Sequence, residues 1–409
     1  MRIRASLMPE ASTDYRRIGE NIRRARRYRG KSLEELAGLI GRSKSWLSRV
    51  ENGLIPLEKR IDIARIADAL QVSTDDLLGE ATTAIPRVRH HGDVMRIREV
   101  LLDSSLTSPL DVPARPVAQL AADWEGPIFT ARQKSDHATL CRVLPDVIAE
   151  LHVHVAAGDE RDKTTALRLL VDVCSATAFL LRHNGQIDLA WIAADRAAQA
   201  AAILGDPVWI GAACFAQAHA RPSVARYRAF RLVAAAADAV QPHLGDDRTA
   251  HEVYGMLRLS AALAATIDGD HATARAHADE AQEVADRLGD RVGAWQWFGP
   301  SNVGTWRCLL AVEAGRPEQA LQFGASVNPK ALASRGRESS LHIELARAHA
   351  MLGHTRECVA ELRIAERLSP MRVYHNPLVR ELVSAQLERA RRDAGGRELR
   401  GLAHRMGVI

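Results

Sequence analysis

Apolar residues recur at helical spacing along almost the whole chain, and this pattern predicts an all-α fold. The clearest stretch places apolar residues at i, i+3, i+4 and i+7, which form one face of about two turns: Leu33, Leu36, Ala37 and Ile40. A second short helix follows, with Leu47 and Val50 on its inner face. Similar spacing predicts flanking helices over 15–29 and 61–70. A fifth helix begins after Ser73 and ends at Leu77 and Leu78.

Capping residues set the ends of the two central helices. Ser32 and Glu35 make a capping box at the start of the first helix, and Ser43 caps the second. Gly41 and Gly53 follow the two helices, at positions that often need a positive φ. Two short helices joined by a tight turn with a glycine form a helix-turn-helix. In this motif the second helix can enter a DNA major groove.

Residues 15–79 resemble the phage-repressor-like (Xre/Cro) helix-turn-helix family. The matching positions are Leu36-Ala37, Gly41, Ser43, Leu47-Ser48, Glu51, Gly53, Pro56, Ala69-Leu70 and Val72. The resemblance implies a five-helix domain that binds a near-palindromic operator as a homodimer. It also implies that Arg26 and Glu51 form an internal salt bridge. In place of a glutamine that often contacts DNA in this family, the chain has Leu33, which removes one contact or replaces it with a contact to a thymine methyl.

By the same resemblance, Lys44, Ser45 and Arg49 face the base edges, and Ser43 and Asn52 hold phosphates. The spacing agrees, because residues 45 and 49 are four apart and share one helix face. Arginine and lysine suit guanine O6 and N7, and a bidentate pair gives about 1–3 kcal/mol of base discrimination. The full predicted DNA-binding set is Arg42, Ser43, Lys44, Ser45, Trp46, Ser48, Arg49 and Asn52. For Trp46, packing on the sugar-phosphate edge and partial burial in the core are equally open.

Charge is unevenly distributed along the chain. Residues 1–79 contain 16 Lys and Arg against 11 Asp and Glu, and their net charge of +5 equals that of the whole chain. The remaining residues are neutral overall, so the excess positive charge lies on the module that resembles a DNA-binding domain. The chain has no apolar run of membrane-spanning length, and its first residues lack the apolar core of a secretory signal. These features predict a cytoplasmic, nucleoid-associated protein with no membrane partner.

The sequence has no catalytic or cofactor-binding motif such as HExxH, GxSxG or a P-loop. His152 and His154 are two residues apart on a predicted helix and face different ways, so they cannot share a metal ion. His137 and Cys141 have a suitable spacing but no third ligand. We therefore expect no enzyme activity, no cofactor and no metal site.

Beyond a linker over 80–116 with one helix, the sequence has a recurring pattern of a glycine, four residues and then a small residue. It occurs at Gly185 and Ala190, Gly269 and Ala274, Gly315 and Ala320, and Gly353 and Cys358. The pattern resembles the tetratricopeptide repeat, in which one helical hairpin cannot bury its own apolar face and must stack on its neighbours. Residues 117–409 are therefore expected to form a tetratricopeptide-like, right-handed α-solenoid, and residues 1–14 an N-terminal arm.

The segment WQWFGPSNVGTW over 295–306 holds three of the seven tryptophans. Gly299 and Pro300 predict a break in the helix there. Long actinobacterial regulators that the chain resembles have the same F-G-P-S/T-N-V motif. One interpretation is an effector pocket lined by Trp295, Trp297, Phe298, Asn302 and Trp306, in which the asparagine pairs with the ligand, as with a peptide backbone in Gram-positive peptide-pheromone receptors. The other is a packed aromatic core around a distorted repeat.

Together these features predict a sequence-specific DNA-binding transcription regulator whose repeat domain senses a small-molecule or peptide effector. Two alternatives stay open. In one, the repeat domain docks a protein partner and would present an open apolar groove. In the other, the chain is an adaptor that does not bind DNA.

Overall fold

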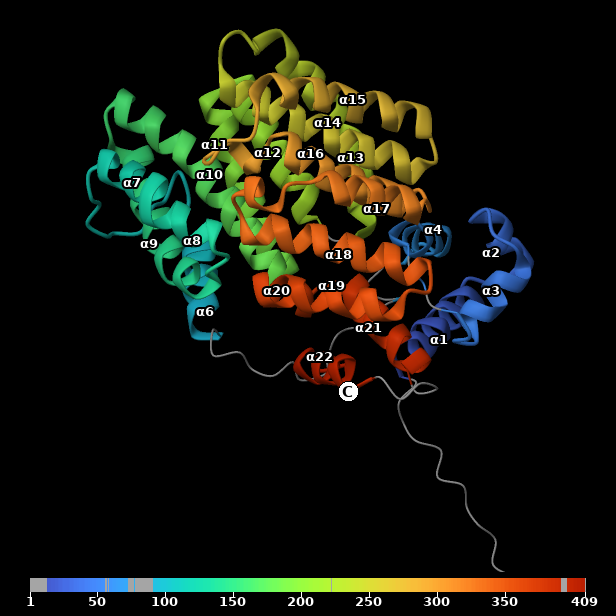
Figure 1. The fold of residues 1–409 in the computed structure, drawn as a ribbon. Coiled ribbons are helices and arrows are strands. Elements are labelled where there is room, and N and C mark those ends of the chain that lie inside the picture. The colour runs from blue at the N-terminus through green and yellow to red at the C-terminus, as the bar shows by residue number, and fades with distance from the viewer. Residues whose placement is uncertain are drawn as a thin grey trace, which may run out of the picture. The chain divides into compact units, whose positions relative to one another are not determined.

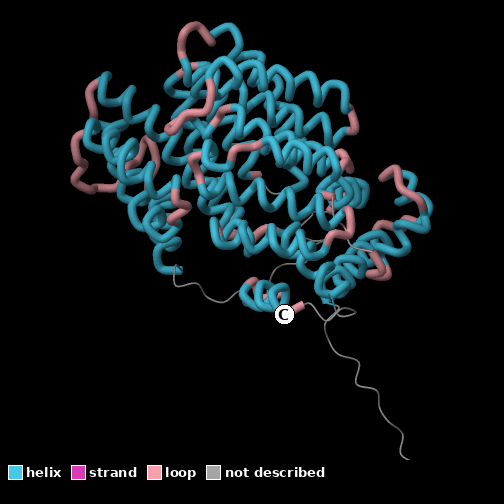
Figure 2. Tube along the Cα trace, viewed as in Figure 1, coloured by secondary structure: helices cyan, strands magenta, loops and turns pink. Residues whose placement is uncertain are grey.

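The computed structural model describes residues 13–55, 57, 59–72, 77, 91–221, 223–390 and 396–408, and the regular structure in these residues is entirely helical (Figures 1 and 2). The predicted all-α fold class is thereby confirmed. The chain divides into two compact units. Unit 1 is formed by Met1–Pro86 together with Pro377–Ile409, and unit 2 by Arg87–Asn376.

The described helices of unit 1 include α1 (Thr13–Tyr28), α2 (Leu33–Leu39), α3 (Lys44–Glu51), α4 (Arg60–Leu70), α21 (Pro377–Ala390) and α22 (Arg397–Arg405). The capping box at the start of α2 is present, and Ser43 caps α3 through the backbone N–H of Trp46. Gly41, in the turn between α2 and α3, has a φ of +66°. The local signals in the sequence therefore predicted both motif helices correctly.

The fifth predicted helix falls largely outside the described residues, which include only Leu77 from that segment. Leu77 is fully buried, and its carbonyl accepts a hydrogen bond from Asn21 Nδ2 at 3.1 Å. Most of the residues that the helical spacing selected lie in the apolar core of unit 1: Ile18, Ile22, Leu36, Ala37, Ile40, Leu47, Val50, Ile63, Ile66, Ala67 and Leu70. Leu33, also on the predicted apolar face, is half-buried.

The C-terminal helices α21 and α22 belong to unit 1, which corrects the assignment of residues 377–409 to the repeat domain. Helix α21 contacts α1, and the buried Glu381 accepts a hydrogen bond from the backbone N–H of Leu57 at 2.9 Å. Arg380 donates to the carbonyl of Met406 at 2.6 Å and so connects α21 to the end of α22. Both ends of the chain thus build unit 1.

Unit 2 consists of α-helices joined by turns and by short π- and 3₁₀-helical segments. Its α-helices are α6 (His91–Asp103), α7 (Val117–Asp123), α8 (Phe129–Gln133), α9 (His137–Ala157), α10 (Glu160–His183), α11 (Ile187–Leu204), α12 (Pro207–Ala220), α13 (Ser223–Val240), α14 (Arg248–Asp268), α15 (His271–Leu288), α16 (Pro300–Glu313), α17 (Pro317–Ser326), α18 (Arg335–Met351), α19 (Thr355–Leu368) and α20 (Pro370–Tyr374). The short segments are η1 (Trp124–Ile128), which is a π-helix, and the 3₁₀ turns η2 (Gln241–His243), η3 (Trp295–Trp297) and η4 (Pro329–Leu332).

The helices of unit 2 form stacked hairpins. Each even-numbered helix from α10 to α18 pairs with the odd-numbered helix that follows it, and it also contacts the next even-numbered helix. The even-numbered helices therefore make one continuous layer, and the odd-numbered helices make the other. The glycines at 185, 269, 315 and 353 all have a positive φ in the turns within the hairpins, and the small residue five positions after each of them is buried. A helical-repeat domain is thus confirmed, and the linker helix α6 packs on its α9.

The two ends of this stack meet. A Cβ added to Gly336, in the first turn of α18, would lie 3.1 Å from Ser135 Oγ, just before α9. A Cβ on Gly185, after α10, would lie 2.9 Å from His375 Nδ1, just after α20. The last helices of unit 2 therefore pack against its first long hairpin.

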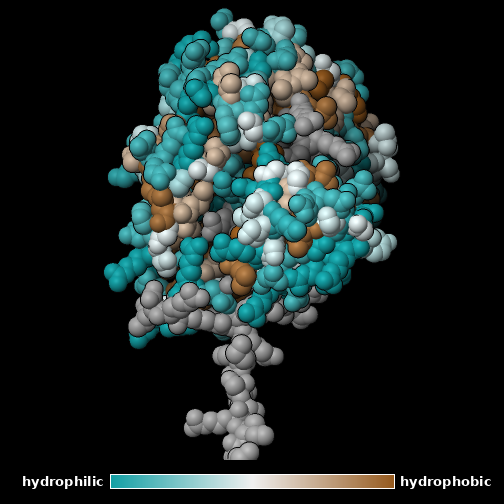
Figure 3. Space-filling model, turned by 90° about the vertical axis from the view of Figure 1, so that its right-hand side faces the viewer, coloured by the Kyte–Doolittle hydropathy of each residue, from teal (hydrophilic) through white to brown (hydrophobic). Residues whose placement is uncertain are grey.

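Helix α10 is the one described helix that is long and apolar enough to cross a membrane, and 61% of its most apolar window is buried inside the structure. A core helix of this kind satisfies the same length and hydropathy criteria. The face of the molecule drawn in Figure 3 is largely hydrophilic, with hydrophobic residues in small separate groups.

The core of unit 2 offers a first prediction. A Cβ on Gly255 of α14 would lie 2.1 Å from Cζ of Phe298, a side chain that is only 1% exposed. We expect Gly255→Ala to destabilise unit 2 by about 1–3 kcal/mol because the ring cannot move without strain. Calorimetry of the full chain should show a lower unfolding midpoint. Gly126→Ala is the matched control, since nothing lies within 4 Å of its added Cβ. Equal midpoints for the two variants would contradict the packing argument.

Candidate nucleic-acid interface and effector site

Helix α3 presents one polar face to solvent. Leu47 and Val50 are buried in unit 1, whereas Ser45 and Arg49 are exposed and have no hydrogen-bond or ion-pair partner among the described residues. Their spacing of four residues puts both on one side of the helix, as the sequence predicted. Lys44, also exposed, forms a solvent-accessible ion pair with Glu34 at 3.1 Å. Such pairs contribute little stability, so the lysine can exchange its partner for a phosphate.

Arg42 and Trp46 are held within unit 1. The Arg42 guanidinium makes a bidentate ion pair with the buried Asp62 of α4, at 2.8 Å from NH2 to either carboxylate oxygen. Its Cζ lies 5.1 Å from the centre of the Trp46 ring, which is half-buried. This cation–π contact and the ion pair fix the start of α3 against α4. The second of the two interpretations of Trp46, partial burial, matches its surroundings.

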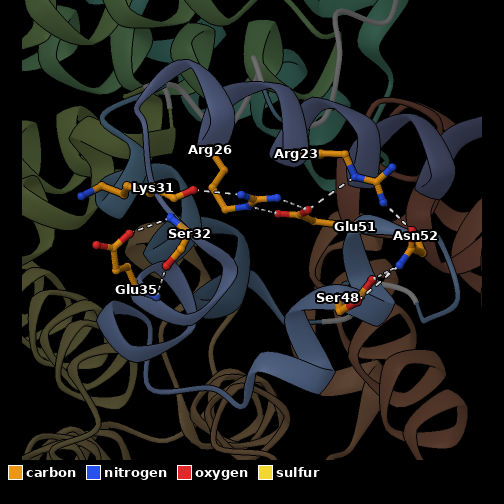
Figure 4. A network of polar contacts seen from close by, with 8 residues as sticks. All are labelled: Arg23, Arg26, Lys31, Ser32, Glu35, Ser48, Glu51 and Asn52. Atoms are coloured by element: carbon orange, nitrogen blue, oxygen red, sulfur yellow. Dashed lines mark hydrogen bonds and ion pairs between the residues drawn. The ribbon is translucent and has the colours of Figure 1, made fainter.

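Ser48 and Asn52 form a local network at the end of α3. Asn52 Nδ2 donates to the carbonyl of Ser48 at 2.7 Å, and Asn52 Oδ1 accepts from Arg23 of α1 (Figure 4). The side chain of Asn52 is therefore oriented by protein contacts while the residue itself is exposed. A group held in this way is suited to contact a phosphate without further ordering.

A buried ion pair joins α1 to α3. Arg26 donates to Glu51 Oε1 at 2.6 Å and to Oε2 at 2.8 Å, and its third contact is the carbonyl of Lys31 at 2.8 Å (Figure 4). The hydrogen bonds that Arg26 donates to Glu51 raise the pKa of Arg26 above its ordinary value. The salt bridge implied by the family resemblance is thus confirmed. It fixes the helix that carries the exposed polar face.

Loss of this pair should loosen the motif. In Glu51→Ala the buried Arg26 loses its counter-charge, and we expect a cost of about 3–5 kcal/mol in local stability. Hydrogen exchange of α1 and α3 amides in the full chain measures this loss. Glu34→Ala, which breaks the exposed pair with Lys44, is the control and should cost at most about 1 kcal/mol. Similar exchange rates in both variants would show that the buried pair does not hold the helices together.

In unit 2, the tryptophan-rich segment connects α15 to α16. Trp295–Trp297 form a single 3₁₀ turn, in which Gln296 and Trp297 have φ values of +49° and +56°. Such values are unusual for residues other than glycine and indicate local strain. Pro300 is the first residue of α16, so the break predicted at Gly299 and Pro300 is confirmed. A Cβ at Gly299 would lie 2.5 Å from Asp290 Oδ1, and only glycine fits there.

The five residues proposed to line an effector pocket differ in exposure. Phe298 is 1%, Asn302 1% and Trp306 4% exposed, whereas Trp295 and Trp297 are half-buried. Asn302 Nδ2 donates to the carbonyl of Gln296 at 3.1 Å, which ties the turn to α16. Three buried polar atoms have no hydrogen-bond partner in the described structure: Asn302 Oδ1, Trp297 Nε1 and Trp306 Nε1. The asparagine oxygen can accept a hydrogen bond, and the two indole N–H groups can donate one each. Phe298 is part of the core.

Sequence reasoning missed two charged residues beside these tryptophans, Arg132 and Asp172. Trp295 Nε1 donates to Asp172 Oδ1 at 3.1 Å, and the Cζ of Arg132 lies 5.2 Å from the Trp297 ring centre and 4.4 Å from that of Trp124. Burial raises the pKa of Asp172 to about 6 and lowers that of Arg132 to about 10. Arg132 and Asp172 are 40 residues apart on different helices, and no local motif marks them.

Asp172 should make unfolding depend on pH. Its pKa is raised in the folded state, so the folded chain binds more protons than the unfolded chain between pH 4 and pH 6, and this contribution to stability is lost as pH rises through about 6. Asp172→Asn keeps an acceptor for Trp295 and carries no charge. We expect the variant to gain stability relative to the original chain as pH rises from 4 to 7, as measured by urea unfolding. A difference that does not change with pH would contradict the raised pKa.

Among the described residues, no group of three or more His, Cys, Asp and Glu side chains is placed to hold a metal ion. His152 is buried and shares a hydrogen bond with Ser104 Oγ at 2.7 Å. His137 contacts Asn184 Nδ2 at 3.1 Å.

Comparison with known proteins identifies the first module. A family model described as a helix-turn-helix domain matches residues 17–80. Residues 17–80 are a helix-turn-helix domain. No curated protein matches the chain in sequence. A solved structure that matches is the crystal structure of the Streptococcus dysgalactiae SHP pheromone receptor Rgg2, at 11% identity over 85% of this chain and 97% of that chain, with a TM-score of 0.20. At that TM-score we draw no conclusion from the likeness.

Proposed function

We propose that the chain is a DNA-binding transcription regulator that binds a near-palindromic operator as a homodimer and senses an effector through unit 2. One observation carries the DNA-binding part: within a helix-turn-helix domain, Ser45 and Arg49 lie exposed on α3 with no partner among the described residues, while the neighbouring Arg26 and Arg42 are held in ion pairs. A regulator of this kind acts in the cytoplasm, where the DNA is.

Each residue of the predicted DNA-binding set has a role in this proposal. Arg49 donates to a guanine through two of its guanidinium nitrogens, and Ser45 contacts the neighbouring base. Contacts with phosphates set the position of α3 on the DNA. These contacts come from Lys44, Ser43, Asn52 and Ser48. Arg42 and Trp46 act indirectly because their contacts with each other and with Asp62 orient the start of the helix.

For the effector, the proposal rests on the half-buried Trp295 and Trp297 and on the three unsatisfied polar atoms beside them. Aromatic walls with a few polar groups are typical of sites for small molecules or peptides. Arg132 and Asp172 add one charge of each sign to this site. An effector changes DNA affinity only as far as it binds better to one of the two conformations of the chain.

Selection of random DNA duplexes by the full chain tests the proposal. A two-fold symmetric motif is the expected result, because two copies of α3 would occupy successive major grooves about one helical turn apart. Enrichment by unit 1 alone, with residues 1–86 linked to residues 377–409, but not by the full chain, would indicate that unit 2 restrains DNA binding until an effector is present. If neither protein enriches a motif, DNA binding is refuted and an adaptor becomes the better explanation.

Arg49→Ala should abolish the preference for the selected motif over an unrelated duplex, with a loss of about 1–3 kcal/mol per half-site. Arg400→Ala is the matched control, because it removes the same charge from an exposed position on α22 of the same unit. Fluorescence anisotropy with both duplexes measures the preference, and circular dichroism verifies the fold. An equal effect of the two substitutions would mean that α3 does not contact the bases.

A further inference from the structure

Basic side chains gather where the two ends of unit 2 meet. We call this group the seam cluster: His137 of α9, His183 of α10, Arg337 of α18, Arg372 of α20, and His375. The rings of His137 and His183 are stacked with their centres 6.4 Å apart. A Cβ on Gly336 would lie 3.0 Å from Arg372 NH2 and 3.1 Å from Ser135 Oγ, and His375 faces Gly185. All five residues are half-buried.

The arginines of the seam cluster have no carboxylate partner among the described residues. Arg372 donates to Ser340 Oγ at 3.0 Å, and its Nε is buried without a hydrogen-bond partner. The Arg337 guanidinium has no hydrogen-bond or ion-pair partner within the described part of the chain. Among the described residues, the carboxylate of Asp136 attracts His137, but it already caps α9 through Thr139.

Three other enclosed arginines of this chain are paired with carboxylates. Arg347 contacts Glu344 at 2.6 Å and Glu313 at 2.9 Å, and Arg258 contacts Asp238 and Glu280 at 3.0 Å each. Arg26 has Glu51. Enclosed charges normally require such partners, because removal from water is costly for an uncompensated ion. The seam cluster departs from the pattern of these three arginines, as does Arg132, which stacks on Trp124 and Trp297.

The titration of the cluster reflects this uncompensated charge. Burial together with the nearby Arg337 lowers the pKa of Arg372 to about 9, and burial lowers that of Arg337 to about 10. Burial and then Arg372 lower the pKa of His137 to about 4. The pKa of His183 is also lowered, by burial and by the same two arginines. Both arginines still carry their charge at neutral pH.

We propose that the seam cluster binds an oxyanion, a carboxylate or phosphate group, through Arg337 and Arg372. The planar guanidinium forks match such groups in geometry and charge, and the hydroxyl of Ser135 lies beside Arg372. This anion site goes beyond the proposed function, which places the effector at the tryptophans. The binding site itself does not depend on DNA binding.

An anion at this position would act on the closure of unit 2. His137 and His183 come from its first long hairpin, whereas Arg337 and Arg372 come from its last helices. Without an anion Arg337 and Arg372 repel each other, and an anion bound to them also contacts groups of the first hairpin. Helix α20 ends at Tyr374, and α21 of unit 1 begins at Pro377. Two residues therefore separate α20, which carries Arg372, from α21, and α21 contacts α1 of the helix-turn-helix domain.

The first test is anion binding to the full chain, with inorganic phosphate and citrate as separate probes and chloride at matched ionic strength as the reference. We expect one of the two probes to raise the thermal unfolding midpoint along a saturable curve, and calorimetric titration to give one site per chain. The probe that acts distinguishes a phosphate from a carboxylate group. No shift with either probe, or a shift that does not saturate, overturns the proposal.

Variants locate the site. Arg337→Gln and Arg372→Gln should abolish the saturable shift, whereas Arg335→Gln, an exposed neighbour on α18, should keep it. In chloride alone, the first two variants should unfold at the same temperature as the original chain or higher, because they relieve repulsion. This result also shows that they fold. A shift that survives in Arg372→Gln, or that is lost in Arg335→Gln, overturns the assignment.

A final measurement separates this inference from the proposed function. If anion binding is found, DNA affinity for the selected motif should change at least about fivefold when the active probe is added, and the change should be absent in Arg372→Gln. Saturable anion binding without any DNA motif would leave the site intact and refute the regulator. A DNA motif without anion binding would refute the anion site and leave the regulator proposal intact.

Discussion

The structure of unit 2 depends on the fact that one helical hairpin cannot bury its own apolar face. Each hairpin must stack on the next, so the even-numbered helices form a continuous layer from α10 to α20. Tight turns with a left-handed glycine, such as Gly185 and Gly353, keep paired helices antiparallel, and small residues allow their close approach. Because the last helices pack against the first hairpin, the two ends of the stack also cover each other.

Charge sets a second constraint on the fold. Within the helix-turn-helix domain, Arg26 and Arg42 are each held by a carboxylate, and these pairs orient α3. In unit 2, Arg347 follows the same rule. Arg337 and Arg372 depart from it, and they lie where distant helices meet. We interpret these two arginines as functional, because an enclosed charge without a partner destabilises the fold. Such a charge is retained where a ligand of opposite charge compensates it.

The path of the chain connects the two parts of the proposed mechanism. Unit 2 is inserted between the two segments that build unit 1, so it is joined to unit 1 by two covalent connections. One of these connections runs directly from α20 to α21. Glu381 on α21 accepts a hydrogen bond from the backbone N–H of Leu57 in the helix-turn-helix domain. A rearrangement at the end of unit 2 therefore has a short route to the helices that contact DNA in our proposal.

The sequence by itself determined the local structure: the capping box at Ser32, the turn at Gly41, the glycines within the hairpins, and the start of α16 at Pro300. These features depend on backbone conformation and helical spacing, which a few neighbouring residues specify. Only the tertiary structure decided that α21 joins unit 1, that Arg132 and Asp172 flank the tryptophans, and that Phe298 fills the space over Gly255. Such contacts join residues tens to hundreds of positions apart. Periodicity within one helix shows which face is buried but carries no record of the partner that covers it.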